Sequence, residues 1–175
     1  HSGESDFLLT YAHDAVSLIH QLDPYPMLQL GREWAIPVCR PDSSGQPLYP
    51  IDNRGKPIPW LSYGSHSFFA HALAQMLSEH PLPLEPVYEN GMSVNLKAMV
   101  LAGGGVAWLP LSLVHEELSS GALVRAGSDD WEIKLAIRLY RQPVLRTPQA
   151  EQLWQRIQQC ETAHAACWRH TMQKR

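Results

Sequence analysis

Two kinds of hydrophobic pattern alternate along this chain of 175 residues. Continuous apolar runs at residues 7–11, 34–39 and 58–62 predict strands, and an unbroken apolar run is typical of a strand covered on both faces. Directly after the third run, apolar residues recur three and four positions apart over residues 69–77, which predicts a helix. Strands that alternate with helices predict the α/β class with right-handed crossovers.

The same alternation continues through the second half of the chain. Glycines at 103–105 predict a turn, and Gly121 predicts the end of a helix. Alternating apolar and charged positions over residues 133–139 predict a strand, and Pro148 predicts the first turn of a long C-terminal helix. The intervening elements are a strand at 87–89, a helix at 94–101 that Ser93 could cap, a strand at 106–109 and a short helix at 112–119.

Composition narrows the possible partners and locations. The chain is 45% hydrophobic and 9% aromatic, which suits a packed core. Its net charge of −3 and the absence of any run of Lys or Arg indicate that this chain alone does not bind nucleic acid. The longest apolar stretch, residues 99–111, is shorter than the roughly 20 residues of a membrane span, so we expect no membrane contact. Three cysteines without framework spacing indicate a reducing, cytoplasmic location.

A metal site on the last predicted helix is one possible interpretation of its histidines and cysteines. Cys160, His164 and Cys167 fall on one helical face with His170 nearby, and thiolates with imidazoles bind zinc. However, the same stripe continues from Trp154 as an apolar seam, and structural zinc usually takes ligands from more than one element. We therefore predict no metal ion.

Catalysis and cofactor binding are both disfavoured. Ser65 has His66 and His71 near it in sequence, but no G-x-S-x-G elbow surrounds it and no acidic residue is placed to orient the base. The glycines at 103–105 follow a helix and precede a strand, the reverse of a phosphate-binding loop. Nothing assigns an acid–base role to Glu89. We therefore predict no catalytic residue, no cofactor and no enzymatic activity.

The segment from Glu89 to Pro110, ENGMSVNLKAMVLAGGGVAWLP, combines a helix, a glycine turn and a strand in a recognisable order. It resembles the effector-binding domain of LysR-type bacterial transcriptional regulators. Gly3 to Leu9 resembles the family's G-x-x-D motif before the third strand of subdomain I, and residues 115–124 and 148–157 follow in the family's order. The resemblance therefore covers almost the whole chain.

The resemblance implies an α/β fold of two Rossmann-like subdomains joined by crossover hinge strands, like a type 2 periplasmic binding protein. Residues 1–37 and 126–175 would form an incomplete subdomain I, and residues 38–125 would form subdomain II. Nothing in the chain matches the family's winged helix-turn-helix, linker helix or first two strands and helices. The chain would thus be an N-terminally truncated fragment, and DNA would be bound only by the absent N-terminal domain of the parent protein.

The expected site follows from the same resemblance. In open α/β sheets, ligands bind beyond the carboxyl ends of strands, where helix N-termini offer unpaired N–H groups. Two such junctions occur, at residues 63–67 and 91–95, and the family's inducers bind between these elements. The resemblance places five residues around an effector: Tyr63, Ser65, Ser67, Met92 and Ser93. For the serines the alternative is that they only cap helices.

Met92 is also a candidate oxidant sensor. Residues 37–39, 60–63 and 105–110 resemble most the hypochlorite-responsive branch of the family, which uses methionine oxidation as its trigger. A thioether beside a polar cleft can be oxidised to a polar sulfoxide, which changes local packing. The alternative is that Met92 fills a gap between other side chains.

Three functions remain in competition. The first is a sensor domain that binds a small-molecule effector, or senses an oxidant, between its subdomains and controls DNA-bound homodimers or tetramers. The second is a soluble solute-binding transport receptor of the same two-lobed fold. The third, an enzyme on the same scaffold, lacks a catalytic constellation. Because subdomain I would be incomplete, we also expect apolar surface to be exposed there.

Overall fold

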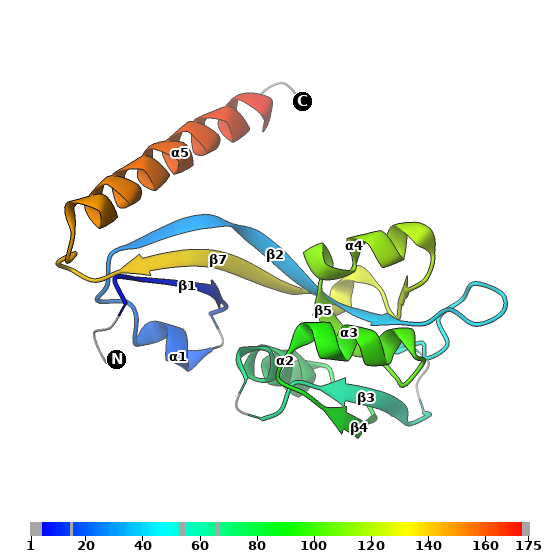
Figure 1. Ribbon diagram of the computed structural model, residues 1–175. Coiled ribbons are helices and arrows are strands. Elements are labelled where there is room, and N and C mark those ends of the chain that lie inside the picture. Colours follow the sequence, from blue (N-terminus) through cyan, green and yellow to red (C-terminus); the bar gives the residue numbers. More distant parts are fainter. Residues whose placement is uncertain (1–4, 15, 53–54, 66, 173–175) are drawn as a thin grey trace. The chain divides into compact units, whose positions relative to one another are not determined.

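The computed structural model describes residues 5–14, 16–52, 55–65 and 67–172 (Figure 1). Gly3 and His66 lie outside this described part. The chain divides into two compact units, which we call unit 1 (His1–Arg32 with Ala136–Arg175) and unit 2 (Glu33–Leu135). The subdomain boundaries expected from the resemblance, after residues 37 and 125, stay a prediction.

The described elements form a mixed α/β fold. The larger sheet has the strand order β1-β7-β2-β5, with β6 also paired to β2, and β3 and β4 form a separate parallel pair. The strands are β1 (Phe7–Ala12), β2 (Met27–Cys39), β3 (Ile58–Ser62), β4 (Leu84–Glu89), β5 (Ala107–Pro110), β6 (Val124–Arg125) and β7 (Ile133–Arg141). The helices are α1 (Ser17–His20), α2 (Phe68–Glu79), α3 (Ser93–Leu101), α4 (Leu111–Ser120) and α5 (Pro148–Met172), with a 3-10 turn, η1, at Asp129–Trp131.

Strand direction and strand coverage differ in part from the sequence prediction. The β1/β7, β2/β5 and β2/β6 pairs of the larger sheet are antiparallel, whereas alternating strands and helices favour parallel pairing. Residues 35–39 are buried, as a strand covered on both faces requires, but Leu9 of β1 is 61% exposed. The prediction of two-sided coverage is therefore wrong for β1, which lies at the end of the strand order and is apolar without being covered.

Unit 1 is held together by aromatic packing between β1, β2, β7 and α5. Leu28, Leu139 and Trp154 form its buried cluster, and the ring of Phe7 stacks on Trp154 with centroids 6.3 Å apart. The guanidinium of Arg141 lies 5.1 Å from the centre of the Trp154 ring, where the aromatic face attracts a cation. These contacts fix the first turns of α5 to the strands.

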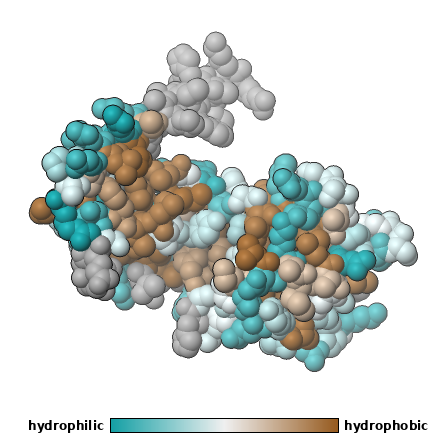
Figure 2. Space-filling model, viewed as in Figure 1, coloured by the Kyte–Doolittle hydropathy of each residue, from teal (hydrophilic) through white to brown (hydrophobic). Residues whose placement is uncertain are grey.

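The start of α5 agrees with the sequence. Pro148 occupies the first helical position, and the Thr147 hydroxyl accepts a hydrogen bond from the Ala150 amide at 3.2 Å. Figure 2 shows apolar side chains gathered over the strands of unit 1. Several large apolar residues of this unit are exposed, as expected: Leu8, Leu9, Met27 and Leu30.

Unit 2 contains the larger core. Its buried cluster includes Leu61 of β3, Leu96 and Val100 of α3, and Leu109 of β5. On the side away from β4, β3 is hydrogen-bonded to the chain just before β5: the Leu61 amide donates to the Val106 carbonyl at 2.9 Å. Thus β3 is hydrogen-bonded to β4 on one side and to the segment leading into β5 on the other.

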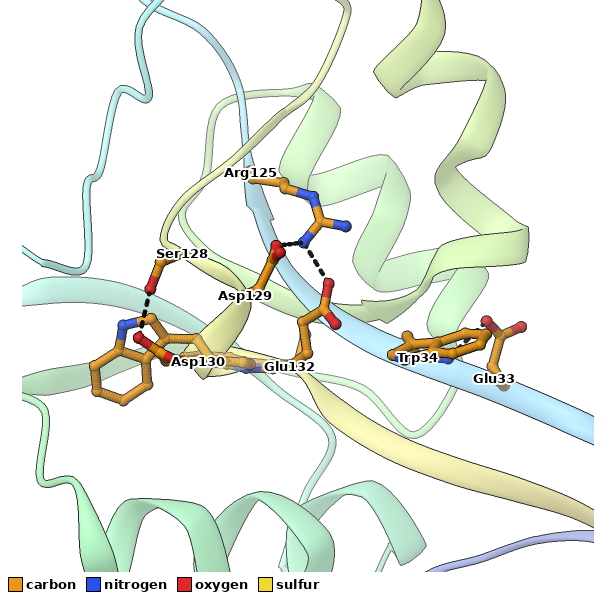
Figure 3. A network of polar contacts seen from close by, with 9 residues as sticks. Glu33, Trp34, Arg125, Ser128, Asp129, Asp130 and Glu132 are labelled. Carbon is orange, nitrogen blue, oxygen red and sulfur yellow. Dashed lines mark hydrogen bonds and ion pairs between the residues drawn. The ribbon is translucent and has the colours of Figure 1, made fainter. Parts of the chain in front are cut away.

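The chain just before β7 is anchored by polar contacts within unit 2 (Figure 3). Arg125 of β6 pairs with Asp129 at 3.1 Å and also with Glu132. The indole N–H of Trp131 donates to an Asp52 carboxylate oxygen at 2.7 Å. These contacts fix η1, which precedes β7, to Arg125 of β6 and to Asp52.

Glu33 is a buried carboxylate in β2 (Figure 3). It accepts a hydrogen bond from the Trp34 amide at 2.9 Å and one from the Ser112 hydroxyl in the first turn of α4. A buried charge requires such partners, and a helix N-terminus favours an anion. Glu33 therefore ties β2 to the start of α4.

We predict that Gly105→Ala destabilises the protein strongly. Gly105 has a φ of 155°, and a Cβ there would lie 2.4 Å from the Pro59 carbonyl oxygen. Backbone strain and overlap together should cost about 3 kcal/mol or more. Denaturant unfolding measures the loss, with Gly91→Ala as control, because a Cβ at Gly91 meets nothing within 4 Å. Equal stability of the two variants would contradict this prediction.

Candidate functional site

The candidate site lies where β3 and β4 end. The strands are parallel, Ser62 lies opposite Glu89, and the Asn90 amide donates to the Ser62 carbonyl at 3.0 Å. Parallel strands bring their carboxyl ends to one edge, so the loops that lead into α2 and α3 lie next to each other. We call residues 63–65 and 90–93 the paired loops.

A hydrogen bond between side chains joins the paired loops to each other. The hydroxyls of Tyr63 and Ser93 are 2.9 Å apart. Tyr63 is only 5% exposed, and its ring stacks on Phe69 of α2 with centroids 4.6 Å apart. The Tyr63 side chain therefore connects β3, α2 and α3.

Ser93 does not cap its helix, so that prediction is wrong. The N-cap position of α3 is Met92, which makes no side-chain cap hydrogen bond, and Ser93 is already helical. A residue inside the helix cannot turn its hydroxyl back to the first amides in the way an N-cap does. The Ser93 hydroxyl instead contacts Tyr63.

Ser67 and Ser65 have different roles. Ser67 is the N-cap of α2: its hydroxyl accepts from the Ala70 amide at 3.0 Å and donates to the Gly64 carbonyl at 3.1 Å. Ser67 therefore caps α2. Ser65 is exposed, and no hydrogen bond joins its hydroxyl to the described residues.

Asn90 shapes the second of the paired loops, and the sequence analysis missed it. Its side-chain oxygen accepts from the Met92 amide at 2.9 Å and from the Asn95 side chain at 3.2 Å. The Asn-Gly pair at 90–91 is a turn signal that could have revealed it. The turn leaves Met92 60% exposed, so Met92 fills no gap in the core.

Glu89 packs against the other loop. Gly64 has a φ of 81°, and a Cβ there would lie 2.9 Å from Oε1 of Glu89. The carboxylate therefore lies directly over the backbone of Gly64. Positive φ and this close approach both require glycine at the position.

Lys97 of α3 makes polar contacts with α4. The Lys97 ammonium donates to the Leu113 carbonyl at 3.0 Å and pairs with Glu117 of α4. The hydrogen bond from Lys97 holds the pKa of Glu117 below its usual value. This pair joins α3 to α4 and leaves the Lys97 charge neutralised.

The two described cysteines differ in exposure. Cys39 is fully buried, and burial raises the pKa of its thiol, which keeps it protonated and a poor nucleophile. Cys160 on α5 is exposed, while the side chains of His164, Cys167 and His170 lie outside the described part. Within the described residues, no three His, Cys, Asp or Glu side chains gather around a common point for a metal.

None of the described helices is both long and apolar enough to cross a membrane.

Comparison with known proteins gives consistent matches. The LysR substrate binding domain family matches residues 1–161. The HTH-type transcriptional regulator YjiE of Escherichia coli is 30% identical over 161 residues, which are 91% of this chain and 51% of YjiE. The HTH domain-truncated transcriptional regulator QseD of another Escherichia coli strain is 29% identical over 91% of this chain and 64% of QseD. The chain thus spans less than two thirds of each of these curated relatives.

Solved structures agree with the sequence matches. The apo regulatory domain of HypT from Salmonella typhimurium has a TM-score of 0.80 at 26% identity, over 92% of this chain and 75% of that domain. HypT is described as a hypochlorite-specific LysR-type transcriptional regulator. Sequence and structure therefore point to the same family.

We predict that the Tyr63–Ser93 hydrogen bond couples the two loops energetically. Tyr63→Phe and Ser93→Ala should each destabilise the protein by about 1 kcal/mol, since each leaves a hydroxyl without its partner. The double variant should lose less than the sum, with a coupling energy of about 0.5 kcal/mol or more. Tyr63→Phe combined with Ser78→Ala is the matched control and should be additive. Additive losses for the first pair would refute the coupling.

Proposed function

The chain belongs to the LysR substrate-binding domain family, and we propose that its paired loops recognise the effector of a bacterial transcriptional regulator. The observation that carries the proposal is the 2.9 Å contact between Tyr63 and Ser93. It joins the two strand-to-helix loops between which inducers of this family bind. The family consists of regulatory binding domains, so the chain is not an enzyme.

The residues of the paired loops divide into anchors and contact groups. Tyr63 and Ser93 hold the loops together, whereas Ser65 and Met92 are exposed and free of the core. We assign effector contact to Tyr63, Ser65, Ser67, Met92 and Ser93. An effector that competes for the Tyr63 or Ser93 hydroxyl would change the link between β3 and α3, and only such a difference in affinity between states can shift a conformation.

The wider proposal follows the family's organisation. We propose two Rossmann-like subdomains of the type 2 periplasmic-binding-protein kind, with the effector held between them and the signal passed through homodimers or tetramers in the cytoplasm. DNA binding is assigned to the parent regulator, because this chain has a net charge of −3 and no basic run. A transport receptor is less favoured, because the curated relatives YjiE and QseD are both named transcriptional regulators.

An oxidant is a second candidate stimulus, and the exposure of Met92 favours it. Met92 is 60% exposed and Met27 is 41% exposed, whereas Met76 and Met99 are half-buried. Oxidation would place a polar sulfoxide at the N-cap of α3, beside the Tyr63–Ser93 contact. The buried, protonated Cys39 is a poor competitor for the oxidant.

We predict that Met92 is oxidised before Met76 and Met99. Graded treatment with hypochlorite followed by peptide mass spectrometry should show its sulfoxide at the lowest doses, because its thioether is the most accessible of those described. Met27, an exposed methionine of unit 1, is the internal control for exposure alone. If Met92 is among the last methionines to be oxidised, the oxidant-sensor proposal fails.

We predict that Ser65→Ala weakens the response of the regulator without lowering its stability. Ser65 is exposed and makes no hydrogen bond within the described part of the chain, so its loss should leave the melting temperature unchanged. A reporter gene driven by the full-length regulator, with hypochlorite as stimulus and then a metabolite library, measures the response. Ser78→Ala on α2 is the control. A Ser65→Ala response equal to that of the control would remove Ser65 from the site.

A further inference from the structure

We propose that Glu89 sets the charge preference of the paired loops: they select an effector that presents a cationic group and discriminate against carboxylate effectors. The inference deepens the proposed function and rests on it, because Glu89 acts at the same site. It concerns the class of ligand, which neither the family match nor the names of YjiE and QseD specify.

The first support is the position of the Glu89 side chain. The three atoms nearest to a Cβ built at Gly64 all belong to Glu89: Oε1 at 2.9 Å, Cδ at 3.2 Å and Cγ at 3.5 Å. The carboxyl end of the side chain is therefore packed on the first of the paired loops. Because Glu89 is the last residue of β4 and lies opposite Ser62 of β3, its strand holds it at the edge where both loops begin.

The second support is that no described residue pairs with the Glu89 carboxylate. No hydrogen bond or ion pair joins its carboxylate to any residue in the described ranges, and the residue is exposed, so a ligand can reach it. Lys97 is committed to Glu117. Lys56 precedes β3 and is therefore at the opposite end of that strand from Tyr63.

The third support comes from the helices that start here. Neither α2 nor α3 carries an acidic residue in its first turn. Helix N-termini attract anions, so a site made only of these two helix starts would favour a carboxylate effector. Glu89 places a carboxylate at this edge already. A second carboxylate would be repelled by it, whereas an ammonium group would find an unpaired partner.

A set of small probes of similar size that differ in charge tests the preference. Butylammonium, butyrate and neutral butyramide are titrated at equal ionic strength into the 175-residue chain, and the amide NMR signals of Gly64, Ser65 and Ser93 are followed. In the wild-type protein, butylammonium should shift these signals and butyrate should not. Glu89→Gln should weaken butylammonium binding by about fivefold, the upper range for an exposed ion pair, and should allow butyrate to bind.

Glu85→Gln is the matched control, because Glu85 is an exposed carboxylate on the same strand. It should behave like the wild-type protein. If Glu89→Gln does not fold, the ratio of butylammonium to butyrate affinity in the wild-type protein decides the question alone.

The remaining outcomes separate this inference from the proposed function. Binding of butyrate to the wild-type paired loops as tight as that of butylammonium, or an unchanged ratio in Glu89→Gln, overturns the charge preference but leaves the site in place. If none of the three probes, butyramide included, shifts these signals in any variant, the paired loops bind no such ligand and the proposed site fails as well.

Discussion

Parallel pairing of β3 with β4 is the constraint on which the candidate site depends. Ladder hydrogen bonds align Ser62 with Glu89, and links from Leu61 and Pro59 to Val106 hold β3 from its other side. With β3 fixed on both sides, the residues that follow both strands emerge at one edge. The contact between Tyr63 and Ser93 and the packing of Glu89 on Gly64 follow from that register.

The site combines a buried anchor residue with exposed loop residues. Tyr63 is buried and stacked on Phe69, and beneath it Leu61 and Leu96 belong to the core cluster of unit 2. Ser65 and Met92 stand outside that core. Side chains in a packed core have few alternative arrangements, whereas exposed loop residues can reorganise at small cost. Such a division suits the proposed sensor, because a ligand or an oxidant would change the exposed residues and the buried tyrosine would pass the change to two helices.

Local rules predicted the elements whose signals lie within a few residues. The apolar run at 58–62 gave the bounds of β3, and Gly121, with a φ of 74°, ends α4 as a left-handed glycine does. Pro148 opens α5, and Ser67 caps α2. Each depends on a local pattern or on the backbone preference of one residue, so no knowledge of distant contacts is needed.

Properties that depend on distant contacts were harder to predict. The first half of β2, residues 27–33, was missed because its side chains are largely exposed and mix polar with apolar types. The antiparallel pairing of the larger sheet and the edge position of β1 are set by partners far away in sequence. For the site, resemblance supplied Tyr63 and Ser93, but only the register of β3 and β4 shows that their hydroxyls meet and that Glu89 lies over Gly64.

We propose that the paired loops at the ends of β3 and β4 hold the effector. The most direct measurement is a crystal structure of the regulator with a compound selected by its thermal stabilisation of the protein. The expected result is ligand density in contact with Tyr63, Ser65 or Ser93. Density bound elsewhere, with the Tyr63–Ser93 hydrogen bond and both loops unchanged, would contradict it.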